Sequence, residues 1–327
     1  MSIVRRDLLK SSALMLGAGL LGANATAQAF PTRPLRLVVP FAAGNSTDLI
    51  ARMLAENMRK ELGQSIVVEN KTGANGIIAA TFVATQPADA HTLLFASDST
   101  MVLNPLLYKK LSYQPDRDLT PIGAIADIPL VMAINPSLPV SNLAEFVAYA
   151  QKNPGRLNFG STGIGGAFHL AGELFKQMAN IDMTHVPYPG GAPATSALLA
   201  GDIQVIFGVV GSLLPHIKSG KLRSLAVATK ERVSVLPHLP TIAESYPNYE
   251  ATVRYGLAVR KGASAESVAA LNDALNKSLA NPAFRTPLEE QGYIVYRPHP
   301  PGTYVALIEK DKTLWGRLIR SRDISLE

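Results

Sequence analysis

The sequence predicts an α/β protein of two lobes with a cleft between them, and three observations lead to this prediction. From Leu35 onward, short apolar runs alternate with longer amphipathic runs, which is the pattern of a sheet whose strands are joined by helices. The chain has 327 residues, more than the commonest single-core domain of about 100–150 residues. Two further apolar stretches, residues 121–135 and 255–259, are expected to pass from one lobe to the other.

The first thirty residues have the order of a bacterial export signal. Arg5, Arg6 and Lys10 are followed by an apolar stretch over 13–22 and by the small-residue cleavage pattern that ends at Ala29. The apolar stretch is shorter than the ~20 residues that a membrane crossing needs. We therefore expect a cleaved leader over 1–29 and an exported protein that does not span the membrane. The arginine pair fits both the twin-arginine and the general secretory route.

The periodic segments after the leader define the expected elements. Seven apolar runs are expected strands, at 35–39, 66–69, 92–96, 157–159, 184–186, 205–207 and 225–228. The clearest helices are expected at 48–62, 143–152, 166–178 and 264–279. In the first of these, apolar residues recur at steps of three and four, which forms one apolar stripe.

The stretch 121–135 is too apolar for a loop and is broken by Pro129, as expected of a strand that leaves one lobe and enters the next. With 255–259 as the return crossover, the chain divides into a first lobe of 30–128 plus 251–327 and a second lobe of 129–250.

Charge and cysteine content exclude several classes of function. Without the leader the net charge is +4, and no cluster of Lys and Arg forms, so nothing points to nucleic acid. The absence of cysteine excludes disulfides, thiolate nucleophiles and zinc–cysteine sites.

Four glycine-rich turns each follow an apolar strand and precede a helix, at 44–47, 73–76, 160–166 and 189–192. The first turn of a helix has unpaired N–H groups and a partial positive charge, so such turns bind anions. Ligands of open α/β sheets bind where these turns gather. Each turn alone could also be simple helix punctuation. Four in one chain favour a site for a small carboxylate.

Individual side chains in these turns have two interpretations each. Asp48 either complements the dipole of its helix or contacts a ligand. Asn45 either caps the helix or donates its amide to an anion. Phe41 and Tyr188 are either core residues or walls of the site. His169 and Glu173 lie four apart on a predicted helix, but no third ligand is near, so we expect a hydrogen-bonded structural histidine and no metal or cofactor.

No motif indicates catalysis. A formal G-x-G-x-x-G at 17–22 falls inside the leader, and P-loop, HExxH and GxSxG patterns are absent from the sequence. We expect a binding protein with no catalytic residues. An exported hydrolase stays an alternative, because a catalytic triad need not be contiguous.

Several motifs together resemble the Bug family, the substrate-binding proteins of tripartite tricarboxylate transporters. They are LVVPFAAG at 37–44 with STD at 46–48, VENKTGA at 68–74, NPLLY at 104–108, NFGSTGIG at 158–165, HL at 169–170, HVPY at 185–188 and LPTIAE at 239–244. The resemblance spans nearly the whole chain after the leader.

The resemblance implies a two-lobed periplasmic-binding-protein fold of type II, a Venus flytrap. It also implies a periplasmic protein that delivers an organic acid to membrane permease subunits, and we expect it to be a monomer. A periplasmic ligand sensor for a membrane receptor stays an alternative. Two turns are implied to hold the carboxylate across the cleft. The expected site consists of Phe41, Gly44, Asn45, Ser46, Thr47, Asp48, Ser161, Thr162, Gly163, Gly165, His169 and Tyr188.

Three positions depart from the family pattern. Asn45 stands where a second glycine is usual, Ala90 replaces a glycine after Asp89, and Arg254 lies near a position where tryptophan is common. Arg254 is expected either to be a solvated hinge residue or to offer its guanidinium to a second carboxylate. The departures leave the identity of the acid open.

Overall fold

The computed structural model describes residues 30–326, and the predicted leader at 1–29 lies outside the described residues. The strands are β1 (Leu35–Val39), β2 (Ile66–Asn70), β3 (Thr92–Ser97), β4 (Leu119–Ile134), β5 (Asn158–Ser161), β6 (Thr184–Pro187), β7 (Val205–Val209), β8 (Arg223–Val227), β9 (Thr252–Arg260) and β10 (Ile294–Val295). The helices are α2 (Ser46–Leu62), α3 (Ile77–Ala84), α4 (Asn104–Leu107), α5 (Pro115–Asp118), α6 (Leu143–Lys152), α7 (Ala167–Ala179), α8 (Gly191–Ala200), α9 (Val210–Lys218), α10 (Ala265–Ala280), α11 (Pro282–Glu289) and α12 (Pro301–Ser321), with short helical turns η1 (Ala74–Gly76), η2 (Ser99–Leu103) and η3 (Ile242–Glu244).

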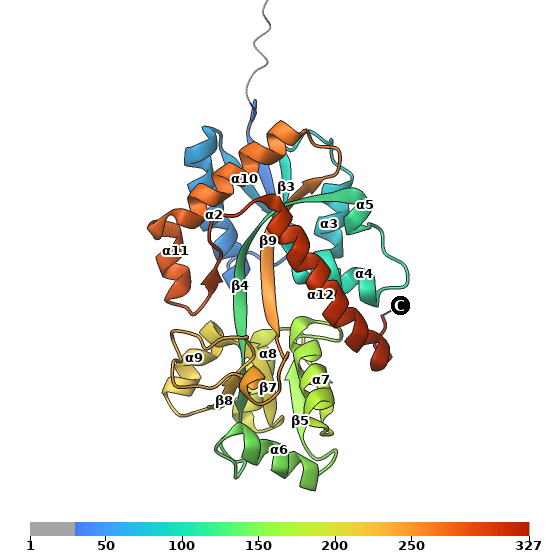
Figure 1. Cartoon of the computed structure of the whole chain (residues 1–327), viewed down its shortest axis with the longest axis vertical. Helices are drawn as coiled ribbons and strands as arrows, with labels where there is room; N and C mark the ends of the chain where they lie inside the picture. The colour runs from blue at the N-terminus through green and yellow to red at the C-terminus, as the bar shows by residue number, and fades with distance from the viewer. Residues whose placement is uncertain (1–29, 327) are drawn as a thin grey trace, which may run out of the picture.

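Two lobes share one sheet through the long strand β4, as Figure 1 shows. The strand order is β2-β1-β3-β9-β4-β7-β5-β6, with β8 and β10 also paired to β4. The pairs β1–β2, β1–β3, β5–β6 and β5–β7 are parallel, and every pair that involves β4 or β9 is antiparallel. The first lobe, at the top of Figure 1, contains β1–β3 and most of β9, and the second contains β5–β8.

The register of β4 fixes the direction of the second lobe's strands. Asp127 of β4 still pairs with β9 and β10, while Leu130 and Ile134 pair with Val209 and Val205 of β7. The carboxyl end of β7 therefore points toward the first lobe. Because β5 and β6 run parallel to β7, their carboxyl ends point the same way.

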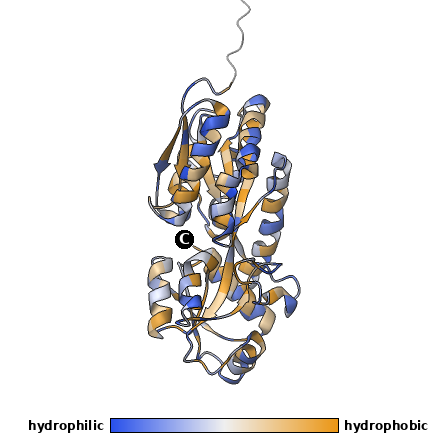
Figure 2. Cartoon of the chain, turned by 90° about the vertical axis from the view of Figure 1, so that its left-hand side faces the viewer, coloured by the Kyte–Doolittle hydropathy of each residue, from blue (hydrophilic) through white to orange (hydrophobic). Residues whose placement is uncertain are grey.

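Apolar side chains form the interior of both lobes. In the first lobe, α2 and α10 cover one face of the sheet, where Ile50 and Leu54 pack in one core with Leu271 and Leu275. Helix α12 crosses the other face, and Figure 1 shows it running down toward the second lobe. In Figure 2, the strands are predominantly orange, for hydrophobic residues, and the blue residues lie mainly on the helices and loops. This arrangement buries the apolar stripes that the sequence predicts.

The predicted α/β fold of two lobes is confirmed, and the seven predicted strands and four predicted helices each begin and end within two residues of the observed ones. Both crossovers are strands, β4 and β9. The predicted lobe boundaries fall inside β4 and just before β9. No change in secondary structure marks the first boundary, so the division stays a prediction. Among residues 30–326, no helix is long and apolar enough to cross a membrane.

Candidate functional site

A cavity of about 530 Å³ lies between the lobes and extends into the second one. We call it the cleft. Ser46 and Thr47 of the first lobe line it together with Thr162 of the second. The two turns that the sequence singles out as a carboxylate site therefore meet at one cavity. The turn at 73–76 is not among the described residues that line it.

The turn between β1 and α2 is held by its own polar groups. Gly44 has a φ of +80°, a conformation that favours glycine, and its N–H donates to Asp48 Oδ2 at 2.9 Å. Asn45 Oδ1 accepts from the N–H of Asp48 at 2.9 Å, so Asn45 caps α2. The hydrogen bond from Arg52 to Asp48 lowers the pKa of that carboxyl to about 2, so Asp48 is ionised at neutral pH.

Asn70 also fixes this turn, and the sequence analysis missed it. Its Nδ2 donates to Asp48 Oδ1 at 2.8 Å and to the carbonyl oxygen of Phe41 at 2.9 Å. The side chain of Asp48 is only 2% exposed and all its contacts are within the protein. Asp48 and Asn70 thus shape the turn from behind, while Ser46 and Thr47 face the cleft. The hydroxyl of Thr47 is hydrogen-bonded to that of Tyr255 at 2.7 Å.

In the second turn, adjacent hydroxyls differ in position. Thr162 lines the cleft, whereas Ser161 is fully buried. Ser161 Oγ lies 2.6 Å from Nε2 of His185 and accepts from the N–H of Gly163 at 3.1 Å. Gly163 has a φ of +129°, and a side chain there would be strained. Ser161 therefore holds the shape of the turn that presents Thr162.

His169 packs behind the same turn. Its Nδ1 accepts from the N–H of Gly165 at 3.0 Å, and its ring lies against that of His185 with centroids 3.9 Å apart. Burial lowers the pKa of His169 to about 4, so its ring is neutral at neutral pH. Glu173 binds Lys176 at 2.8 Å. No group of three potential metal ligands occurs among residues 30–326.

A serine 2.6 Å from an imidazole is also the arrangement expected of an activated nucleophile. Two facts favour a structural role for the pair of Ser161 and His185. Ser161 is 0% exposed, so a substrate cannot reach its hydroxyl. Burial and the neighbouring ring of His169 lower the pKa of His185 to about 4, which makes it a weak base at neutral pH.

The second lobe contributes more of the cleft than the sequence analysis expected. Thr195, Ser196 and Leu199 of α8 lie at helical spacing along one side, and Ser212, Leu213 and His216 of α9 lie along another. The turn before α8 was one of the four glycine-rich turns, but the helix itself was left out of the expected site. Helix α9 was not expected at all. Tyr188, which was expected in the site, is half-buried and packs into the core of the second lobe.

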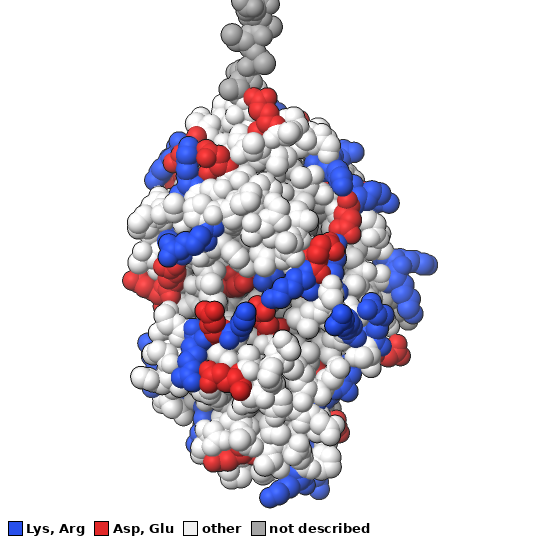
Figure 3. Space-filling view, viewed as in Figure 1, with Lys and Arg blue, Asp and Glu red and all other residues white. Residues whose placement is uncertain are grey.

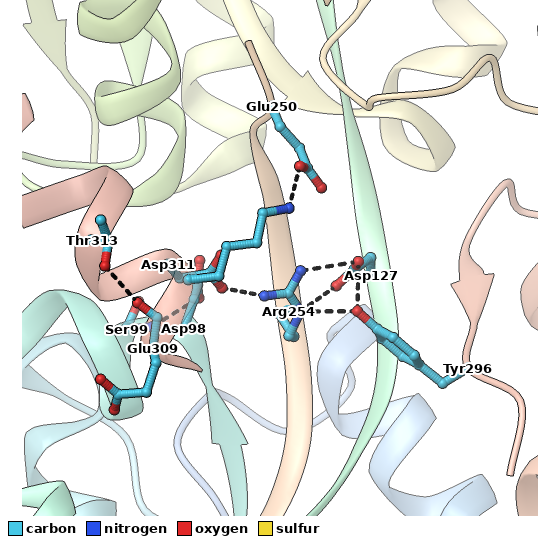
Figure 4. Close-up of polar contacts among 10 residues, drawn as sticks. Asp98, Ser99, Asp127, Glu250, Arg254, Tyr296, Glu309, Asp311 and Thr313 are labelled. Carbon is cyan, nitrogen blue, oxygen red and sulfur yellow. Dashed lines mark hydrogen bonds and ion pairs between the residues drawn. The ribbon is translucent and has the colours of Figure 1, made fainter. Parts of the chain in front are cut away.

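Both interpretations of Arg254 are wrong. The residue is only 4% exposed and is not among the described residues that line the cleft. Its guanidinium forms ion pairs with Asp127 of β4, at 2.8 Å, and with Asp311 of α12, and the hydroxyl of Tyr296 joins the cluster, as Figure 4 shows. Because Arg254 is buried in this cluster, it is not a solvated hinge residue. Its guanidinium binds carboxylates of the protein and not those of a ligand.

Charge on the surface is mixed. On the face that Figure 3 shows, acidic and basic side chains are interspersed, in agreement with the small net charge of the sequence. That face therefore has no extended basic patch of the kind that binds nucleic acid.

Comparison with known proteins adds independent findings. A family model described as the tripartite tricarboxylate transporter family receptor matches residues 50–324. The curated protein BugT of Bordetella pertussis is 33% identical over 289 residues, covering 84% of this chain and 89% of that protein. The structure of Rpa4515 of R. palustris with adipate is 34% identical with a TM-score of 0.81, covering 90% of this chain and 99% of that one. The structure of MatC from Rhodopseudomonas palustris with bound malate is 33% identical with a TM-score of 0.77, covering 89% and 100%.

Proposed function

Because the chain belongs to the family of tripartite tricarboxylate transporter receptors, which includes the Bug proteins, we propose that it captures a small organic acid in the cleft between its lobes. The acid is then presented to the membrane permease subunits of a tripartite transporter. Adipate and malate, the ligands named for two similar structures, are both carboxylates and support this assignment.

The observation that carries the proposal is the convergence of helix starts on one cavity. Ser46 and Thr47 belong to the first turn of α2, and Gly191 and Ala192 belong to the first turn of α8. The unpaired N–H groups and the dipoles of these helices create a positive potential without any full charge. A carboxylate placed between them gains hydrogen bonds and favourable electrostatic energy.

We assign the expected site residues two kinds of role. Ser46, Thr47 and Thr162 contact the ligand directly, and the backbones of Gly44, Gly163 and Gly165 keep the turns in shape. The remaining expected residues support the turns from behind or flank them, and they are Phe41, Asn45, Asp48, Ser161, His169 and Tyr188.

The strands β4 and β9 connect the lobes and form the hinge about which they close. We further propose that the protein is exported to the periplasm by cleavage of the leader near Ala29, acts as a monomer and catalyses no reaction. A ligand sensor would bind the acid in the same cleft, but its partner would be a membrane receptor and not the permease. Recovery of permease subunits by the ligand-bound protein, but not by the empty one, separates transport from sensing.

Thermal unfolding with a panel of organic acids tests the proposal. The protein is first denatured and refolded to remove bound ligand, and its Tm is then measured with aliphatic, aromatic and amino acids and with the neutral amide of each acid. A ligand that binds only the folded state at about a hundred times its Kd raises the Tm by about 5 °C. The amides, which lack the negative charge, should have little effect. A Tm that no acid in the panel changes would contradict the proposal.

A further inference from the structure

We propose that the cleft selects a monocarboxylate with an apolar body, and that its inner end excludes a second carboxylate. The inference rests on the proposed function and specifies the class of acid. It follows from the charges of the lining, the direction of the helices beside it and the chemistry of the inner walls.

No Lys, Arg, Asp or Glu occurs among the described residues that line the cleft, and His216 is its one histidine. Two nearby arginines, Arg52 on α2 and Arg254 on the hinge strand β9, already form ion pairs or hydrogen bonds within the protein. Arg52 binds Asp48 and Asn70, and Arg254 binds Asp127 and Asp311. A second carboxylate in the cleft would therefore lose its hydration without gaining a cationic partner, which is unfavourable.

The helices of the second lobe add an electrostatic gradient along the cleft. Val209, at the carboxyl end of β7, lies at the interlobe end, so α9 starts there with Val210 and runs away from the first lobe. Helix α8 follows β6, whose carboxyl end has the same direction, so α8 also starts at the interlobe end. The positive ends of both dipoles thus lie at the mouth, and their negative ends flank the inner part. One carboxylate is favoured at the mouth and a second is disfavoured farther in.

Apolar side chains line the inner part. Leu199 is near the end of α8, Ile206 lies deeper along β7 than Val209, and Leu213 follows on α9. These walls suit an alkyl or aryl body. The nearby hydroxyl of Thr195 donates to the carbonyl oxygen of Gly191 at 2.9 Å, so it offers lone pairs, and not a proton, to a ligand. Ser196, Ser212 and His216 also line the cleft and can exchange hydrogen bonds with a neutral polar group, but no Lys or Arg lies among the described lining residues to stabilise a second anion.

Pairs of acids that differ only at the far end test this inference. Isothermal titration calorimetry compares hexanoate with adipate, which replaces the terminal methyl by a carboxylate, and with 6-amino-6-oxohexanoate, which replaces it by a neutral amide. Benzoate and terephthalate form a second pair. We expect each monocarboxylate, and the amide, to bind at least about tenfold more tightly than its dicarboxylate.

A cation at the inner end should reverse the preference. The variant His216→Arg is expected to strengthen adipate binding at least about tenfold and to leave hexanoate binding nearly unchanged. The matched control Ser219→Arg adds the same charge directly after the same helix, outside the described lining of the cleft, and it should change neither affinity.

The inference is overturned if either dicarboxylate binds the unmodified protein as tightly as its monocarboxylate, or if only dicarboxylates raise the Tm in the thermal panel. Both outcomes leave the proposed function intact. Equal adipate affinity in His216→Arg and the unmodified protein would overturn the assignment of the inner end to His216. If no acid of any kind binds, the proposed function fails and the inference fails with it.

Discussion

At the scale of single residues, Ser161 and Thr162 show that neighbouring hydroxyls of one turn can have separate roles. Thr162 borders the cleft, while Ser161 is buried against His185. Because a strand alternates the direction of its side chains, residues at its carboxyl end naturally face opposite ways. We therefore assign ligand contact to Thr162 and support of the turn to Ser161.

The substitution Thr162→Ala should weaken binding of the acid by about 1.5–3 kcal/mol, the value of a hydrogen bond to a charged group. The free energy of unfolding without ligand should barely change, because Thr162 is only half-buried. Calorimetric titration with the best acid of the thermal panel and urea unfolding measure the two effects.

Ser161→Ala is the matched control. It leaves Nε2 of the partly buried His185 without this partner, so it should lower the free energy of unfolding by about 1–3 kcal/mol. Unchanged affinity in Thr162→Ala would place the carboxylate elsewhere in the cleft.

The sequence predicts which turns form the site better than it predicts the role of each residue. Glycine, serine and threonine at the start of a helix form a local pattern that indicates an anion-binding turn. Ser46, Thr47 and Thr162 were predicted from this pattern, and all three line the cleft. The partners of Asp48 could not be predicted, since Asn70 is 22 residues away and meets it only through the pairing of β1 with β2. The burial of Arg254 depends on α12, more than fifty residues later.

At the scale of elements, the accuracy of the sequence prediction follows local pattern. Helix α2 has one apolar stripe and was predicted to within two residues. Helix α9 contains Pro215 and only nine residues, which interrupts the helical pattern, so it was missed. Helix α8 is rich in small residues and lacks a polar face of its own. The missed side of the cleft therefore belongs to a short helix that contains a proline and to a helix of mostly small residues.

The strand β2 supports the site through Asn70, and this contact can be tested. Asn70→Ala removes the two hydrogen bonds that tie the turn at 41–48 to β2. We expect the free energy of unfolding to fall by about 1–3 kcal/mol and the affinity for the acid to fall about fivefold or more, because the loosened turn must be ordered again on binding.

Asn57→Ala provides the comparison. Asn57 makes two hydrogen bonds, to Met53 and to Asn281, against the three of Asn70, and it is not among the described residues of the cleft. It should lose stability without losing affinity. If both variants bind equally well, Asn70 stabilises the fold only.

At the scale of the whole molecule, charged groups are buried where the two lobes join. Arg254 on β9 pairs with Asp127 on β4 and with Asp311 on α12, so one guanidinium links both hinge strands to the helix that crosses them (Figure 4). Asp98 lies at the same small cavity and is 7% exposed. One cation thus faces three carboxylates, and the carboxylate with the least compensation should be reluctant to ionise.

Burial, reinforced by the charges of Asp311 and Asp127, raises the pKa of Asp98 to about 7. The folded state therefore holds a proton that the unfolded chain releases near pH 4. Between these two values the folded state binds more protons, so the contribution of Asp98 to stability is complete below about pH 4 and is lost as the pH rises through 7.

Asp98→Asn cannot ionise, and it keeps the oxygen that accepts from the N–H of Ser99 at 2.8 Å. The variant should match the unmodified protein in free energy of unfolding at pH 4 and exceed it by on the order of 4 kcal/mol at pH 8, since three pKa units correspond to about 4 kcal/mol. Urea unfolding across this range measures the difference, and the exposed Asp202→Asn should leave the profile unchanged. A difference between Asp98→Asn and the unmodified protein that stays constant from pH 4 to 8 would mean that Asp98 is ionised in the folded state throughout. The buried hinge would then be stable because its charges are fully compensated, and not because one of its carboxyls is neutral.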